Sequence, residues 1–185
     1  MGIGRDMRRL CNELAGGLRL PVPAPPGELY RALCEAMSRR RGRPVHFRAA
    51  AFPPGTASGL WLDLADRDLV VVEERTAPVH QLVILGHELW HLQADHRGHH
   101  VDGIGVAARL LHDDTDQDAF QATVRRVAAR TRFDLAEERE AEAFGLLLAS
   151  RCRTWLAGSA RAPVQLDDVV GRIEASLGYH AGAQG

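Results

Sequence analysis

The feature that most constrains this chain is the pair His87 and His91, which lie four residues apart in a stretch that is strongly apolar from Leu82 onward. On an α-helix, residues four apart lie on the same face, so both imidazole rings can direct a nitrogen at one point. Glu88 is rotated by about 100° from His87 around the helix axis, which leaves its carboxylate beside that point. The spacing therefore predicts a helix with two metal ligands and, next to them, a group that can accept a proton.

Two histidines and a neighbouring glutamate in this arrangement suit hydrolysis with zinc. A catalytic zinc ion has three protein ligands and an open position for water, whose pKa falls toward about 7. Glu88 would activate that water and pass its proton to the leaving amine of a peptide. The alternative is a pair of surface histidines, since a five-residue match can arise by chance. Trp90 is expected to pack in the core, with a substrate pocket as the alternative, and Gly86 permits close approach of another element.

A third ligand must come from elsewhere in the chain. One set of candidates is close in sequence: His96, His99, His100 and His112. The other is an acidic run at the start of a predicted long helix: Glu137, Glu138, Glu140 and Glu142. The 47 residues from His91 to Glu138 leave room for the chain to return, so that a second helix can lie against the first. That geometry favours the glutamates, although it leaves Glu137 and Glu140 open beside Glu138.

Glu138 is the preferred member of the acidic run. It shares one helix face with Ala141, Glu142 and Gly145, and the small Ala141 and Gly145 would let two helices approach closely. Glu138 is then expected to bind the zinc, and Glu142 to accept a hydrogen bond from a ligating histidine. The alternative is a solvated acidic first turn, because glutamates are favourable near a helix N-terminus.

The remaining pattern indicates an α+β fold, mainly helical, with a small antiparallel sheet of about three strands beside the helix of the motif. A strand is expected to begin at residues 45–48, and the short polar loop at 65–67 favours an antiparallel hairpin between 59–64 and 68–72. The helix of the motif should begin at Pro78 and stop near residues 97–98. A short helix is expected in the segment up to Leu20 and should end near residues 16–17. Further helices are expected over 28–40, 117–130, 135–156 and 164–177.

The length of 185 residues is that of one ordinary domain, with 45% apolar and 25% charged residues. We expect a single domain over residues 1–185. It comprises an N-terminal helix and proline-rich connector at 1–27, a metallopeptidase-like core at 28–157, and a C-terminal helix and tail at 158–185. The widely spaced Cys11, Cys34 and Cys152 indicate buried thiols in a reducing compartment, so a cytoplasmic location is expected.

The net charge of -1 gives no electrostatic reason to expect binding to nucleic acid or to a membrane. No apolar run reaches the roughly 18 residues of a membrane-spanning helix. One basic run stands out: Arg39, Arg40, Arg41 and Arg43. Arginines favour a helix C-terminus because they oppose its negative end, which is the preferred interpretation, and a nucleic-acid contact is the alternative.

The histidine motif and the acidic run resemble two motifs of the ImmA/IrrE-like zinc metallopeptidases. This gluzincin-type family pairs His-Glu-x-x-His with a downstream Glu-x-x-Ala-x-x-Phe-Ala-like segment. The counterparts are His87-Glu88-Leu89-Trp90-His91 and Glu138-Arg139-Glu140-Ala141-Glu142-Ala143-Phe144-Gly145, and the similarity spans roughly residues 28–152. The resemblance implies a zincin-like fold in which His87, His91 and Glu138 bind zinc and Glu88 is the base. The chain departs from the pattern at Gly145, where Ala is usual, at Glu142, where Asn or Asp is common, and at Trp90, where Gly is common.

The expected function is that of a zinc-dependent metallo-endopeptidase acting on a specific intracellular protein. The resemblance implies a helix-turn-helix transcriptional repressor as that partner. The alternative is a zinc-binding regulatory interaction module with little or no proteolytic activity. The presence of Glu88 favours an enzyme, because a structural zinc needs no general base and closes all four positions with protein ligands. Candidates for stabilising an oxyanion, none with a spacing argument, are Tyr30, His46, His80, His112 and Tyr179.

Overall fold

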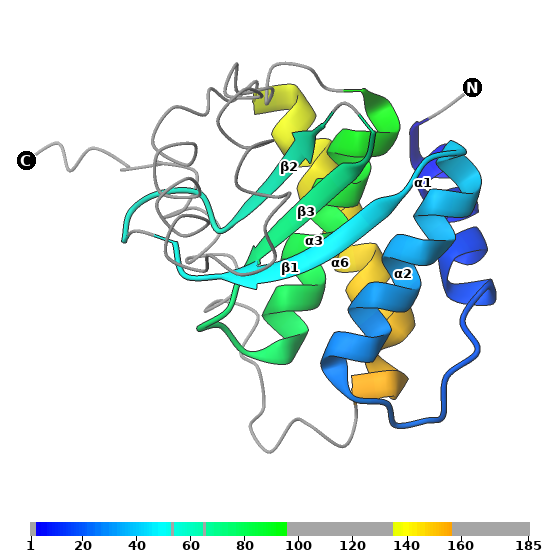
Figure 1. Ribbon diagram of the computed structural model, residues 1–185. Helices are drawn as coiled ribbons and strands as arrows, with labels where there is room; N and C mark the ends of the chain where they lie inside the picture. The colour runs from blue at the N-terminus through cyan, green and yellow to red at the C-terminus, as the bar shows by residue number, and fades with distance from the viewer. Residues whose placement is uncertain (1–2, 53, 65, 96–134, 157–185) are drawn as a thin grey trace, which may run out of the picture.

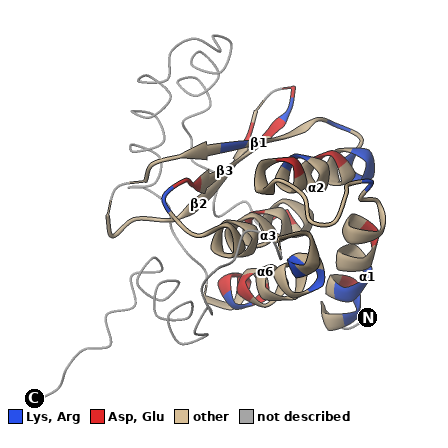
Figure 2. Cartoon of the chain, turned by 90° about the horizontal axis from the view of Figure 1, so that it is seen from below, with Lys and Arg blue, Asp and Glu red and all other residues tan. Residues whose placement is uncertain are grey.

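The computed structural model describes residues 3–52, 54–64, 66–95 and 135–156 (Figure 1). In chain order, the described elements are α1 (Ile3–Gly16), α2 (Pro26–Arg41), β1 (Val45–Ala50), β2 (Gly59–Asp63), β3 (Asp68–Glu73), α3 (Pro78–Ala94) and α6 (Leu135–Leu156). They form three layers: the sheet, then α2 and α3, then α1 and α6 (Figure 2). The described part of the chain therefore has the α+β architecture that the sequence predicts.

The sheet is mixed, and the expectation of an antiparallel sheet is wrong for one of its strand pairs. Its order is β1-β3-β2. The predicted hairpin is present, with β2 antiparallel to β3, whereas β1 runs parallel to β3 and places Val45 opposite Asp68. A short loop sets the direction of β3 relative to β2, but it carries no information about β1. All six residues of β3 are buried, whereas the four residues between Val45 and Ala50 in β1 are exposed or partly exposed, which suits β3 to the centre and β1 to an edge.

The helix α3 carries the histidine motif through the middle of the molecule. It begins at Pro78, whose fixed φ and missing N–H suit the first helical turn. It ends at Ala94, a few residues before the expected stop, because Asp95 adopts a left-handed backbone with φ of 55° and its N–H bonds to the His91 carbonyl. From Leu82 to Leu92, every residue except His87 is buried. The motif is thus held by packing on both sides, against β2 and β3 and against α6.

The other helices bury the faces that their spacing predicts. In α1 these are Leu10 and Leu14, and in α2 they are Leu29, Leu33 and Met37. The three cysteines are also buried and are free thiols, as expected: Cys11, Cys34 and Cys152. Together with α3 and α6, these helices form one continuous core on the helical side of the sheet.

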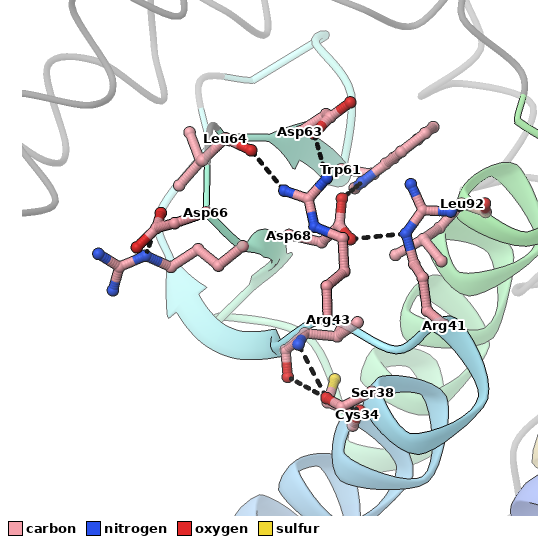
Figure 3. A network of polar contacts seen from close by, with 12 residues as sticks. Cys34, Ser38, Arg41, Arg43, Trp61, Asp63, Leu64, Asp66, Asp68 and Leu92 are labelled. Carbon is pink, nitrogen blue, oxygen red and sulfur yellow. Dashed lines mark hydrogen bonds and ion pairs between the residues drawn. The ribbon is translucent and has the colours of Figure 1, made fainter.

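Carboxylates of the same chain pair with Arg41, in the last turn of α2, and with Arg43 just after it (Figure 3). Arg41 Nε donates to Asp68 Oδ2 at 2.7 Å, and Arg43 Nε lies 3.3 Å from the same oxygen. Asp68 is fully buried and also accepts a hydrogen bond from Trp61 Nε1 at 2.9 Å. Arg41 further donates to the Leu92 carbonyl. The network ties the end of α2 to the sheet and to the end of α3.

Some expectations fall on residues outside the described ranges. These are the helices at 117–130 and 164–177 and the candidates His96, His99, His100, His112 and Tyr179. Among the described helices, none combines the length and the apolar character that a membrane span requires.

Candidate metal centre

Glycines let α3 and α6 pack at very short range. A Cβ atom on Gly86 would lie 2.9 Å from Gly145 Cα, and one on Gly145 would lie 2.5 Å from the Val83 carbonyl oxygen. Neither position has room for a side chain, because the obstructing atoms belong to helix backbone. Ala141, one turn earlier on α6, is fully buried. The close approach predicted from these small residues is therefore present, and it brings the beginning of α6 against the histidines of α3.

Three side chains converge at this contact. His87 Nε2 and His91 Nε2 lie 2.9 Å apart. Glu138 directs one carboxylate oxygen at each ring: Oε2 lies 3.4 Å from His87 Nε2, and Oε1 lies 3.3 Å from His91 Nε2. The ligand atoms of the three residues all lie within 4.8 Å of one another, so the group can hold a metal ion. We call it the His87/His91/Glu138 triad.

The donor set and the spacing of the triad fit a tetrahedral metal. Two imidazole nitrogens and one carboxylate oxygen form a common ligand set of catalytic zinc, with bonds of about 2.1 Å. Ligand atoms around such an ion lie about 3.4 Å apart. The two His–Glu distances of 3.4 and 3.3 Å match that separation, and the His–His distance of 2.9 Å is somewhat shorter. The residues present therefore fit the ion that the motif implies.

The electrostatics of the triad also favour a cation. Burial alone would lower the pKa of His87, but the carboxylate of Glu138, with the charges of Glu88 and Glu142, outweighs it and raises the pKa above its ordinary value. Glu138 and His91 have side chains that are only 4% and 1% exposed. A buried carboxylate needs positive charge nearby, which a metal ion supplies. The side chain of His87, at 16% exposure, marks the side on which the triad is open.

Among the glutamates of the acidic run, Glu138 is the one that joins the triad. It is buried, whereas Glu137, Glu140 and Glu142 are half-buried. Glu142 lies one turn further along α6 and contributes to raising the pKa of His87, so its charge acts on a histidine of the triad. Of these neighbouring glutamates, Glu138 is therefore the one whose carboxylate the structure groups with both histidines.

Glu88 is not one of the three members of the triad, but its charge acts on His87 and contributes to raising the pKa of that histidine. Its side chain is buried between α3 and the first residue of β2: a Cβ atom on Gly59 would lie 2.6 Å from Glu88 Oε1. This glycine was not singled out by sequence reasoning. The signal in the sequence was the glycine itself, because a glycine in a predicted strand is a general sign that another backbone or side chain approaches closely.

The remaining sequence candidates lie elsewhere or serve the core. Trp90 is buried with its ring centroid 5.2 Å from that of Phe144, as expected for core packing. The Tyr30 hydroxyl donates to the Pro78 carbonyl at 2.7 Å, which anchors α2 to the start of α3. His46 is exposed on β1. The metal-ligand group includes none of the described candidates for stabilising an oxyanion, which are Tyr30, His46 and His80, and their assignment to that role stays a prediction.

Comparison of the chain with protein-family models finds no match. The same holds for comparison with curated proteins and with solved structures. The site is consequently defined by its own geometry, which is that of a His-Glu-x-x-His helix completed by a glutamate, as in zincin-like metal sites.

Proposed function

We propose that this chain is a zinc-dependent metallo-endopeptidase. The observation that carries the proposal is the convergence of His87, His91 and Glu138 from two helices, with the charge of Glu88 acting on His87. Three protein ligands are the number found in catalytic zinc sites, which keep a further position for water. The partial exposure of His87 gives such a position an outlet to solvent.

The roles of the residues follow from their places. His87, His91 and Glu138 hold the metal, and Glu142 accepts a hydrogen bond from a ligating histidine, a role supported by the action of its charge on His87. Zinc bound there would lower the pKa of water toward about 7 and polarise the carbonyl of a peptide bond. Glu88 takes a proton from the attacking water and delivers it to the leaving nitrogen. Burial of Glu88 between α3 and β2 restricts its rotamers and so keeps the carboxylate in place.

A peptide substrate is favoured by the strand next to the site. Within the described ranges, β2 pairs with β3 alone and forms an edge of the sheet. An edge strand offers unpaired backbone groups to which an extended peptide can add. Since β2 begins at Gly59, beside Glu88, a peptide aligned on this edge would pass close to the proposed base.

The resemblance of both motifs to ImmA/IrrE-like peptidases supplies the substrate class. On that basis we assign a helix-turn-helix transcriptional repressor as the protein substrate. The rival function is a zinc-binding interaction module that binds a regulator without cleaving it. The burial of Glu88 near the metal ligands favours the enzyme. A site that only binds a metal ion has no need of a further acidic side chain that is not a ligand.

The test uses wild type, Glu88→Gln and the matched control Glu140→Gln. Zinc content is measured by elemental analysis, and cleavage of purified repressors encoded beside the gene is followed by mass spectrometry. We expect equal zinc in all three proteins, cleavage by wild type and Glu140→Gln, and a rate for Glu88→Gln lower by on the order of 10² to 10⁴. Equal cleavage by Glu88→Gln would refute its role as base. Zinc in every protein without cleavage by any of them would favour the interaction module.

A further inference from the structure

Gly59 lies where the sheet and the motif helix come closest to the proposed base. It is the first residue of β2 and is buried. Side chains alternate along a strand, so Gly59 faces the same side as Trp61, which enters the core on the helical side of the sheet. A side chain at position 59 would therefore point directly at α3.

Two side chains of α3 occupy that space. A Cβ atom on Gly59 would lie 2.6 Å from Glu88 Oε1, 3.0 Å from Glu88 Cγ and 2.6 Å from Ile84 Cγ2. Distances this short are not tolerated between non-bonded heavy atoms, so at least one neighbour would have to move. The carboxylate of Glu88 is the end of a flexible side chain, whereas Ile84 is β-branched and stiff. The carboxylate would be displaced first.

From this geometry we propose that Gly59 is a positioning residue for Glu88. The absence of a side chain at position 59 creates the space in which the Glu88 carboxylate is held beside the His87/His91/Glu138 triad. The backbone of β2 forms the wall of that space. The inference rests on the proposed function, because it gives Gly59 a role through the base that this function assigns to Glu88.

The competing explanation is that Gly59 only allows β2 and α3 to pack closely. In that case its substitution would act through Ile84 and the helix as a whole, and the identity of residue 88 would not matter. The two explanations differ in whether the effect of Gly59→Ala depends on the Glu88 carboxylate, which a double-mutant cycle measures.

The experiment uses the full-length, metal-loaded protein with acetohydroxamic acid as probe. A hydroxamate chelates a metal ion and has a proton that a neighbouring carboxylate can accept, so its affinity reports the position of that carboxylate without a known substrate. The proteins are wild type, Gly59→Ala, Glu88→Ala and Gly59→Ala/Glu88→Ala. Gly16→Ala is the matched control, since nothing lies within 4 Å of a Cβ atom there. Affinity is read from the visible spectrum of the cobalt-substituted proteins, and metal content from elemental analysis.

We expect Glu88→Ala and Gly59→Ala each to weaken hydroxamate binding about ten-fold, the loss of one charge-assisted hydrogen bond. The double variant should bind no more weakly than Glu88→Ala, and metal content should be unchanged. In Gly59→Ala/Ile84→Ala, which removes the contact with Ile84, the affinity should stay low. Three results would each overturn the role of Gly59 and leave the proposed function intact. The first is wild-type hydroxamate affinity in Gly59→Ala. The second is a loss of affinity on adding Gly59→Ala to Glu88→Ala that equals its loss in wild type, and the third is recovery of affinity in Gly59→Ala/Ile84→Ala. A Glu88→Ala variant with wild-type affinity would overturn the inference and leave the proposed function to the cleavage assay, whereas a wild type that binds no metal would remove both.

Discussion

Gly145 lies so close to Val83 that a methyl group on its Cα would come within 2.5 Å of the Val83 carbonyl oxygen. This contact between the backbones of α6 and α3 sets the distance between the two helices. Glu138 is on α6 and His87 and His91 are on α3, so the same contact fixes the separation of the metal ligands. The positions of the metal ligands thus depend on Gly145, which is not itself a member of the triad.

Gly145→Ala should therefore damage both stability and the metal site. The added methyl group forces the helices apart, because the Val83 carbonyl belongs to helix backbone, and we expect a loss of about 1–3 kcal/mol in the free energy of unfolding. Zinc affinity should fall as Glu138 moves away from the histidines. Urea unfolding and competition with a chelator measure the two effects, with Gly16→Ala as a control that loses neither. Wild-type stability and affinity in Gly145→Ala would show that α6 can shift without cost.

Metal binding should stabilise the folded chain, because the triad is assembled from segments that come together only on folding. Free zinc at about 100 times its dissociation constant should raise the free energy of unfolding by about 2.7 kcal/mol. Differential scanning calorimetry of protein stripped with a chelator, with and without added zinc, measures this shift. His91→Ala should abolish the response. An equal zinc response in His91→Ala would place the binding site elsewhere.

Asp68 should contribute strongly to stability, since its carboxylate is fully buried and receives hydrogen bonds from Arg41 and Trp61 (Figure 3). Asp68→Asn removes the counter-charge of Arg41, whereas Arg43 keeps its ion pair with Asp63, and we expect a loss of about 1–3 kcal/mol in the free energy of unfolding. Asp66→Asn is the control, because its pair with Arg67 is exposed and should be worth less than about 1 kcal/mol. Equal losses in the two variants would contradict the assignment of the network as a structural anchor.

Glu73 should make stability depend on pH in the acidic range. Burial would raise the pKa of its carboxyl group, but hydrogen bonds from Arg75 and from the Phe52 N–H outweigh this and lower the pKa below its ordinary value of about 4.3. A lowered folded-state pKa stabilises the fold above the unfolded pKa, and the contribution is lost as the pH falls through the folded pKa. Glu73→Gln should therefore be less stable than wild type at neutral pH, and the difference should shrink below about pH 4.

Urea unfolding of wild type and Glu73→Gln over this pH range tests the prediction. The neighbouring Glu74→Gln, with an exposed side chain, should stay within about 0.5 kcal/mol of wild type throughout. A difference between wild type and Glu73→Gln that does not change with pH would rule out ionisation of Glu73 as its origin.

The helices of this fold and the contact between two of them follow from the sequence more fully than the pairing of its strands does. The four-residue spacing of His87 and His91 and the small residues Ala141 and Gly145 predict two helices in close contact, because helical periodicity and side-chain volume are local properties. The parallel pairing of β1 is not predictable in the same way, since no short loop links it to β3. The structure shows the apolar run at residues 69–72 to be part of the buried central strand β3, a position that the expected hairpin alone does not specify.

The candidate site, too, is only partly predictable from the sequence. Periodicity places Glu138 on the face of α6 that also carries Ala141 and Gly145, and that face meets α3. The contact between Gly59 and Glu88 joins a strand to a helix across the chain, and no sequence period connects them. The end of α3 depends on the left-handed backbone of Asp95, which aspartate tolerates but does not require.

The central claim is that His87, His91 and Glu138 bind one metal ion between α3 and α6. Elemental analysis of wild type, Glu138→Ala and Glu140→Ala, purified in the presence of zinc and dialysed against a weak chelator, tests it most directly. Glu140 lies in the same acidic run and is half-buried outside the triad, so it controls for charge. We predict about one zinc per chain in wild type and Glu140→Ala, and substantial loss of zinc from Glu138→Ala. Metal-free wild type, or a greater loss from Glu140→Ala than from Glu138→Ala, would contradict the claim.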